Sequence, residues 1–220
     1  MDPSTLATHA NAPARVAESL RPPAITTRDW RDRLPVLSGT RITLRELVVE
    51  DAPALYAMLS IEEVARFISP APTTINGFAR FIEWAARERR KGLYVCFGIV
   101  PEGMTAPVGL FQLRSLEIGF GLAEWGFILG SPFWGTGAFA DGAKLVVDFA
   151  FDVMGVNRLE ARASVANGRG NGALFKIGAV QEGILRRSFR RFGVYHDQML
   201  WSIVADDWRL QQFACHPRAH

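Results

Sequence analysis

The chain has 220 residues, a formal net charge of +3, and hydrophobic side chains at 49% of its positions. This length suits one large domain or one domain with an extension, and the apolar content supplies a core, which excludes a fully disordered chain. The small charge gives no indication of a nucleic-acid partner, no apolar run reaches the ~18 residues of a membrane helix, and the first residues lack the apolar core of a signal peptide. We therefore expect a cytoplasmic protein, a monomer or homodimer, without a membrane or nucleic-acid partner. Its two cysteines and four histidines show no metal-ligand spacing, so no metal is expected.

Residues 1–38 are rich in Pro, Ala, Thr and Arg. Scattered prolines argue against a packed domain there. We expect an N-terminal extension, partly disordered or draped over the body, followed by one domain over 39–209 and a C-terminal tail over 210–220.

Alternating apolar residues predict a first strand at 41–47, after which Asp51 is expected to cap a helix with Pro53 in its first turn. Thr73 or Thr74 is expected to cap a later helix that ends at Gly92. The other expected strands cover 93–100, 108–113, 123–130, 158–165, 180–189 and 195–204. Together they predict a mixed sheet with helices on both faces.

The stretch 123–153 organises the chain as strand, glycine turn and long helix. Gly135 and Gly137 let the backbone of the turn approach a ligand closely. The helix that starts there presents free N–H groups and a positive dipole end, which favours an anion. The turn is therefore either a phosphate cradle or a strand-to-helix corner without a ligand. It lacks the Lys-Ser/Thr pair of a P-loop and the third glycine of a dinucleotide fingerprint.

The order of elements and several motifs resemble the GNAT acetyltransferase superfamily, in particular the branch of ribosomal-protein N-terminal alanine acetyltransferases. The resemblance covers about residues 40–208. The matching pieces are Glu124-Trp125-Gly126, Phe133-Trp134-Gly135-Thr136-Gly137, Asn167 followed by Lys176-Ile177-Gly178, and Tyr195-His196-Asp197. It implies an α/β (α+β) fold with a mostly antiparallel sheet of about seven strands. It also implies an acetyl-CoA-dependent N-acetyltransferase whose acceptor is a protein N-terminus or a small amine.

The resemblance also implies which residues bind acetyl-CoA. Backbone groups of the turn would hold the pyrophosphate, namely those of Trp134, Gly135, Thr136, Gly137, Ala138 and Phe139, with a further hydroxyl from Thr136. The strand residues Phe127, Ile128 and Leu129 would pair with the pantetheine, and the N–H of Phe127 or Ile128 would polarise the acetyl carbonyl. Asn167 is a pantetheine contact or a turn residue, and Asn171 a helix cap or a cofactor contact.

Direct transfer to an amine needs a base but no covalent enzyme intermediate. Glu124, which begins the central strand, is either that base or a partner of one of the arginines. Tyr195 is either a proton donor to the CoA thiolate or a packing residue with a solvated hydroxyl. The expected hairpin around residues 190–193 is bracketed by Arg186, Arg187, Arg190 and Arg191. These arginines attract an acidic acceptor or the cofactor's 3′-phosphate, or they are simply solvated.

Two positions depart from the family pattern. Phe139 stands where a small residue is usual, so its ring either crowds the cofactor or points into the core. Gly170 stands where a serine is frequent. These departures leave a second hypothesis open, a catalytically degenerate module of the same fold that binds acyl-CoA without turnover.

Overall fold

The computed structural model describes residues 29–67 and 72–215, and it confirms the expected fold. The strands form one sheet in the order β1-β2-β3-β4-β5-β6-β8-β7, in which only β5 and β6 pair in parallel. Eight strands replace the seven or so expected, and β1 has only two residues. The strands are β1 Leu37–Ser38, β2 Ile42–Glu46, β3 Tyr94–Pro101, β4 Gly109–Ser115, β5 Leu122–Leu129, β6 Arg158–Ser164, β7 Val180–Arg191 and β8 Val194–Val204.

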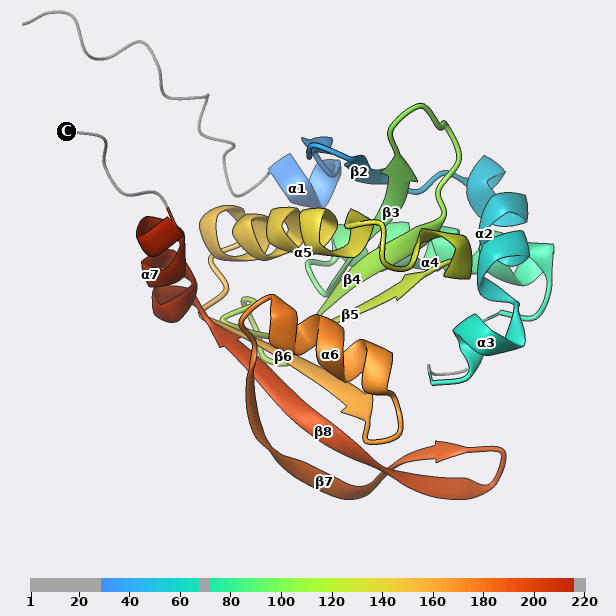
Figure 1. Ribbon diagram of the computed structural model, residues 1–220. Helices are drawn as coiled ribbons and strands as arrows, with labels where there is room; N and C mark the ends of the chain where they lie inside the picture. The colour runs from blue at the N-terminus through green and yellow to red at the C-terminus, as the bar shows by residue number, and fades with distance from the viewer. Residues whose placement is uncertain (1–28, 68–71, 216–220) are drawn as a thin grey trace, which may run out of the picture.

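Helices cover both faces of the sheet (Figure 1), with α5 and α6 in front in that view and α4 behind. The α-helices are α1 Asp29–Asp32, α2 Ala52–Leu59, α3 Glu62–Ala65, α4 Ile75–Arg90, α5 Ala138–Asp148, α6 Gly168–Lys176 and α7 Ala205–Cys215. Short 3-10 turns span Val49–Asp51 and Ser131–Phe133, and a π-helical turn over Phe149–Val153 ends the long helix. Within the part of the chain that the structure describes, no helix is long and apolar enough to cross a membrane.

Strand β3 is buried on both faces. Val95, Phe97 and Ile99 belong to the core under α5, whereas Tyr94 and Cys96 belong to the core under α2 and α4. Because both faces of β3 are covered, its residues need not alternate between apolar and polar. This explains the continuous apolar run that predicted the strand.

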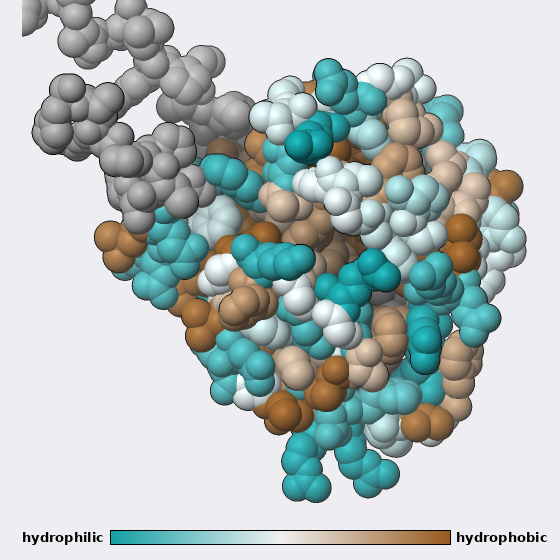
Figure 2. Space-filling model, viewed as in Figure 1, coloured by the Kyte–Doolittle hydropathy of each residue, from teal (hydrophilic) through white to brown (hydrophobic). Residues whose placement is uncertain are grey.

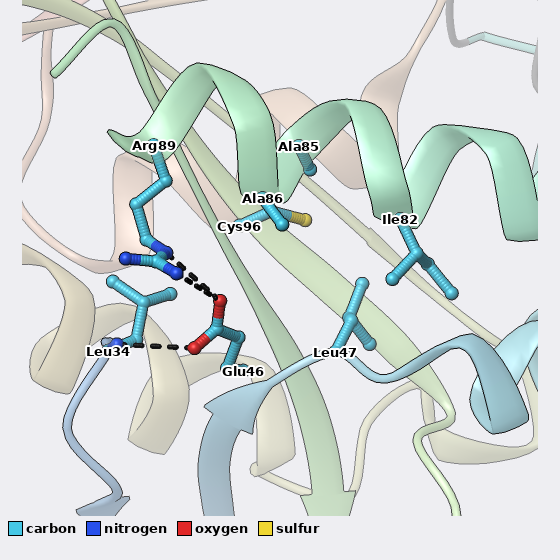
Figure 3. Close-up of a pocket in the computed structure, with 8 residues that line it drawn as sticks. All are labelled: Leu34, Glu46, Leu47, Ile82, Ala85, Ala86, Arg89 and Cys96. Atoms are coloured by element: carbon cyan, nitrogen blue, oxygen red, sulfur yellow. Dashed lines mark hydrogen bonds and ion pairs between the residues drawn. The ribbon is translucent and has the colours of Figure 1, made fainter. Parts of the chain in front are cut away.

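Residues 30–34 are hydrogen-bonded to a part-buried ion pair between Arg89 and Glu46 (Figure 3). Arg89 of α4, only 5% exposed, donates to the Glu46 carboxylate at 2.9 Å and to the carbonyls of Trp30 and Arg31. The other Glu46 oxygen accepts from the backbone N–H of Leu34 at 3.3 Å. Trp30 and Leu34 are buried, so these residues are part of the core despite the Pro-rich sequence around them. Residues 1–28 of the expected extension lie outside the described residues.

The residues at the cap positions of α2 and α4 differ, because only that of α4 bonds to its helix through its side chain. Thr74 accepts from the N–H of Gly77 at 3.0 Å, which confirms it as a helix cap. Asp51 stands at the cap position of α2 but makes no side-chain bond to that helix, so the capping role was wrong. Its carboxylate instead accepts from the N–H of Val48 and binds both terminal nitrogens of Arg45, at 2.7–2.9 Å. The charged partner on β2 outcompetes the neutral helix amides.

The C-terminal helix α7 runs to Cys215, beyond residue 209, at which the expected domain ended. Trp208 is buried, and its indole N–H donates to Asp148 of the long helix at 2.7 Å. Helix α7 therefore packs against the end of α5 through Trp208.

Candidate active site

Strands β5 and β6 separate halfway along their length. Their parallel pairing covers Leu122 with Arg158, Ala123 with Leu159 and Glu124 with Glu160, and then stops. Both strands nevertheless continue, β5 to Leu129 and β6 to Ser164. The sheet therefore opens into a fork whose inner edges lack a strand partner.

The register of β5 against β4 decides which amides face the fork. The N–H of Gly130 donates to the carbonyl of Val108 on the β4 side at 2.8 Å. Because an antiparallel ladder alternates, Ile128 also bonds toward β4, while Phe127 and Leu129 direct their N–H and C=O groups into the fork. Consistent with this, the carbonyl of Leu129 accepts from the indole N–H of Trp134 at 2.8 Å. Of the two candidates for polarising a carbonyl, Phe127 is therefore the one whose amide faces the fork.

The fork opens into a cleft of about 690 Å³. Figure 2 shows that the surface on this side of the molecule mixes apolar and polar residues. Four segments line the cleft: the end of α3 with the residues after it, the end of β5, the glycine turn with the start of α5, and α6. The lining residues are Glu63, Val64, Arg66, Phe67, Phe127, Ile128, Leu129, Phe133, Trp134, Gly135, Gly137, Phe139, Ala140, Asn167, Gly168, Arg169, Gly170, Gly172, Ala173, Lys176 and Ile177. The structure thus brings together most of the expected cofactor residues.

The two turn glycines adopt left-handed backbone conformations, with φ of +74° at Gly135 and +88° at Gly137. A Cβ added at Gly135 would meet no protein atom within 4 Å, whereas one at Gly137 would lie 3.3 Å from the Arg41 side chain. Gly135 is therefore the position where the turn leaves room for another molecule to approach the backbone.

Two turn residues lie outside the cleft lining. The hydroxyl of Thr136 donates to the carbonyl of Phe133 at 2.8 Å, so its proton is used within the turn rather than offered to a ligand. Ala138, the first residue of α5, is buried. Any contact that these two residues make with a ligand would have to come from their backbone.

The side chain of Phe139 points toward the sheet. Its ring centroid lies 4.4 Å from that of Phe127 and 5.9 Å from that of Phe111. The ring therefore packs inward against the sheet, and it also lines the cleft beside Phe127.

Asn167 caps α6, and Asn171 lies four residues further along the same helix. Asn167 lines the cleft, and its side-chain oxygen accepts from the N–H of Gly170 at 2.9 Å, capping the helix. Asn171 is buried outside the lining: it donates to the carbonyl of Ser164 and accepts from the indole of Trp201, both at 2.9 Å. The structure thus gives Asn171 a role in fixing α6 to β6 and β8, and does not bring it to the cleft.

A Cβ at Gly170 would lie 2.4 Å from the amide nitrogen of Asn167. A serine there would therefore require the Asn167 cap to move. Glycine at this position leaves room for the Asn167 side chain to cap α6 as it does here.

Glu124 lies at the base of the fork but does not line the cleft. Its carboxylate forms an ion pair with Arg114, which faces it across β4 and β5. In the parallel register its neighbour is Glu160, whose carboxylate contacts Arg158 at 3.1 Å and Arg162 at 3.7 Å. The salt-bridge alternative is present in the structure, and the role of Glu124 as a base stays a proposal.

Tyr195 stands apart from the cleft, at the start of β8. Its side chain is 52% exposed, and the guanidinium carbons of Arg187 and Arg190 each lie 5.7 Å from its ring centroid. Hydrophilic side chains project from the lower edge in Figure 2, where Figure 1 places this hairpin of β7 and β8. The structure does not bring Tyr195 together with the other expected site residues.

Three cations line the cleft that sequence reasoning missed: Arg66 after α3, and Arg169 and Lys176 on α6. Glu63 is the one carboxylate among the lining residues. Positions 169, 173 and 176 recur at the spacing of one helix face, so the sequence could have placed Arg169 and Lys176 on the same face of α6. Only the fold shows that this face meets the glycine turn. The cleft is therefore suited to an anion.

Among residues 29–67 and 72–215, no group of three or more His, Cys, Asp or Glu could hold a metal ion.

The fold and this cleft define an acyltransferase of the GNAT type. The family described as "Acetyltransferase (GNAT) domain" matches residues 41–180, and the chain belongs to it. The expected resemblance is thereby confirmed, and the protein is a member of a family of N-acetyltransferases.

Relatives and solved structures agree with this assignment. The chain is 28% identical over 178 residues to the "Uncharacterized N-acetyltransferase YoaA" of Bacillus subtilis strain 168, covering 77% of this chain and 97% of that protein. The ribosomal-protein-S5-alanine acetyltransferase of Vibrio fischeri shares the fold with a TM-score of 0.70 and 21% identity, over 79% of this chain and 98% of that one. RimJ of Mycobacterium smegmatis, solved with CoA-disulfide, shares it with a TM-score of 0.73 and 18% identity, over 82% and 93%.

Proposed function

We propose that this protein transfers an acetyl group from acetyl-CoA directly to an amine, either a protein N-terminus or a small molecule. The observation that carries the proposal is the fork between β5 and β6, which opens into a cleft walled by the glycine turn. A structural relative, RimJ, was solved with CoA-disulfide.

The cleft fits acetyl-CoA in size, charge and donors. Its volume of about 690 Å³ lies within the usual range for ligand sites, roughly 300–1,000 Å³. Three cations against one carboxylate suit the phosphates of CoA. The amides of the turn and the start of α5 supply N–H donors for the pyrophosphate. The groups of Phe127 that face the fork supply a β-ladder for the pantetheine amides.

The reaction needs few protein groups. The neutral amine attacks the thioester carbonyl carbon, a C–N bond forms, the C–S bond breaks, and CoA leaves as a thiolate that takes up a proton. The N–H of Phe127 stabilises the negative charge that develops on the carbonyl oxygen. Glu124 accepts the proton that the amine must lose, through water, because its position on β5 is at the base of the same fork. No step requires a covalent enzyme intermediate.

A second function has specific support, namely acyl-CoA binding without turnover. Glu124 is already paired with Arg114, and Tyr195 lies outside the cleft lining. An enzyme lacking both a free base and a nearby acid would bind the cofactor but react slowly.

Calorimetric binding of acetyl-CoA, combined with release of free CoA thiol on a panel of amines and N-terminal peptides, separates these functions. We expect Glu124→Gln to lower the turnover number by about 100-fold or more while the acetyl-CoA dissociation constant stays unchanged. Glu102→Gln, in the exposed turn after β3, is the matched control and should change neither quantity.

Unchanged turnover in Glu124→Gln would remove Glu124 as the base. Binding of acetyl-CoA with no turnover across the panel would favour the binding module. Absence of acetyl-CoA binding would overturn both functions.

A further inference from the structure

Arg169 and Trp134 meet across the cleft. The guanidinium carbon of Arg169, at the start of α6, lies 3.9 Å from the centroid of the Trp134 ring, in the glycine turn. The ring itself is held in place, because its N–H donates to the carbonyl of Leu129 at 2.8 Å. The cation is thus held against the turn that precedes α5, although it belongs to a different helix.

The charge of Arg169 is poorly compensated where it stands. It lies in the first turn of α6, where the helix dipole is positive, and that turn contains no acidic residue. Among the described residues it forms no ion pair with a carboxylate, and its charge rests on the π face of Trp134. A second positive helix end, that of α5, opens into the same cleft. Only an anion entering the cleft would compensate the charge of Arg169 and the positive ends of both helices.

We propose that Arg169 binds the diphosphate of acetyl-CoA, opposite the backbone amides of the turn. This inference rests on the proposed function. The diphosphate is favoured over the 3′-phosphate because the guanidinium already touches Trp134, the residue directly before Gly135 and the turn amides. The planar guanidinium can donate two parallel hydrogen bonds to phosphate oxygens. The face of the Trp134 ring offers no such pair of acceptors, so these donors remain available to a ligand. The stack on Trp134 holds the cation at the cleft before the ligand arrives.

Calorimetry with CoA and with dephospho-CoA, which keeps the diphosphate but lacks the 3′-phosphate, tests the inference. We expect Arg169→Gln to raise the dissociation constants of both ligands by about tenfold or more and to the same extent. Arg169→Lys keeps the charge but loses the planar fork, so it should fall between the wild type and Arg169→Gln. Arg33→Gln, which removes an exposed arginine outside the cleft lining, is the matched control and should bind both ligands as the wild type does.

Three results would overturn the inference. Wild-type affinity of Arg169→Gln for both ligands would show that Arg169 contacts no phosphate. A loss confined to CoA would assign it to the 3′-phosphate instead. If the wild type bound neither ligand, the proposed function would fail first, an outcome distinct from binding that is indifferent to Arg169. Because the side chain is exposed, thermal unfolding of each variant should match the wild type, which separates a lost contact from a lost fold.

Discussion

The ring of Phe127 on β5 and the ring of Phe139 on α5 lie 4.4 Å apart, centroid to centroid, at a tilt of 48°. This contact ties the first turn of α5 to the strand that borders the fork. It also accounts for a large residue next to a tight glycine turn, because the ring fills space between the helix and the sheet.

Truncating Phe139 should therefore lower stability without improving ligand binding. Phe139→Ala loses the contacts with Phe127 and Phe111, and we expect a loss of about 2 kcal/mol in the free energy of unfolding, below the range for a fully buried ring because the side chain is only half-buried. Phe139→Leu should cost about 1 kcal/mol. Urea unfolding measures both changes. Tighter acetyl-CoA binding by Phe139→Ala would show instead that the ring crowds the ligand.

Two glycines of the chain form a natural pair for testing the turn. Gly135 in the turn and Gly103 in the loop after β3 have φ of +74° and +77°, and a Cβ at either would meet no atom within 4 Å. Alanine at each should cost a similar ~1 kcal/mol from left-handed strain. Only Gly135→Ala should weaken acetyl-CoA binding, measured by calorimetry. Equal acetyl-CoA affinity in the two variants would place the phosphates away from Gly135.

The part-buried pair of Arg89 and Glu46 should contribute far more to stability than the exposed pair of Lys91 and Glu88 at the end of the same helix. Arg89→Met leaves Glu46 unpaired and removes donors from the carbonyls of Trp30 and Arg31, so we expect a loss of about 2–4 kcal/mol. Lys91→Met breaks the exposed pair with Glu88 and should cost under ~1 kcal/mol. Hydrogen exchange should show faster opening of residues 30–34 in Arg89→Met alone. Unchanged exchange there would mean that apolar packing holds this segment by itself.

Stability should depend on acid through Glu182. Hydrogen bonds from Arg158 first, and then from Ser202, hold the pKa of Glu182 at about 2. A carboxylate whose pKa is lower when folded adds stability above its unfolded pKa of ~4.3, and this stability is lost as pH falls through that value toward 2. The stability difference between wild type and Glu182→Gln, from urea unfolding, should thus be constant above pH ~5.5 and shrink below ~4.3. A difference that grows with acidity would contradict this linkage.

The thiol of Cys96 should be unreactive in the folded protein. Burial raises its pKa, so little thiolate forms and no reagent reaches it. In a Cys215→Ser background, a disulfide reagent such as DTNB should titrate no thiol at pH 8 in buffer and one in denaturant. Rapid labelling in buffer would show that β3 opens locally under native conditions.

Much of the fold follows from local sequence. The unbroken apolar run at 93–100 predicted a buried strand, and Thr73 or Thr74 was predicted as a cap, because apolar patterning and short-range hydrogen bonds act over a few residues. The positive φ of Gly135 and Gly137 was likewise predictable, since tight turns favour residues without a Cβ. The family resemblance then placed the turn beside a fork between two strands.

Side-chain partners were decided by tertiary structure. Asn171 is drawn inward by Ser164 and Trp201, and Asp51 is drawn from its helix by Arg45. Trp30 packs edge-on against Phe120 in the core, and its carbonyl accepts from Arg89, 59 positions away in the chain. Each outcome depends on a competition between partners that only the packed fold brings together.

The sequence by itself determined that a glycine turn follows the central strand and that an anion would be favoured there. Tertiary structure alone decided that the amide of Phe127, rather than Ile128, faces the fork, and that Arg169 reaches the turn from another helix. The physical reason is distance along the chain. Backbone conformation is set by neighbouring residues, whereas strand register and helix packing, which aim the functional groups, are set by residues that meet only when the whole sheet has formed.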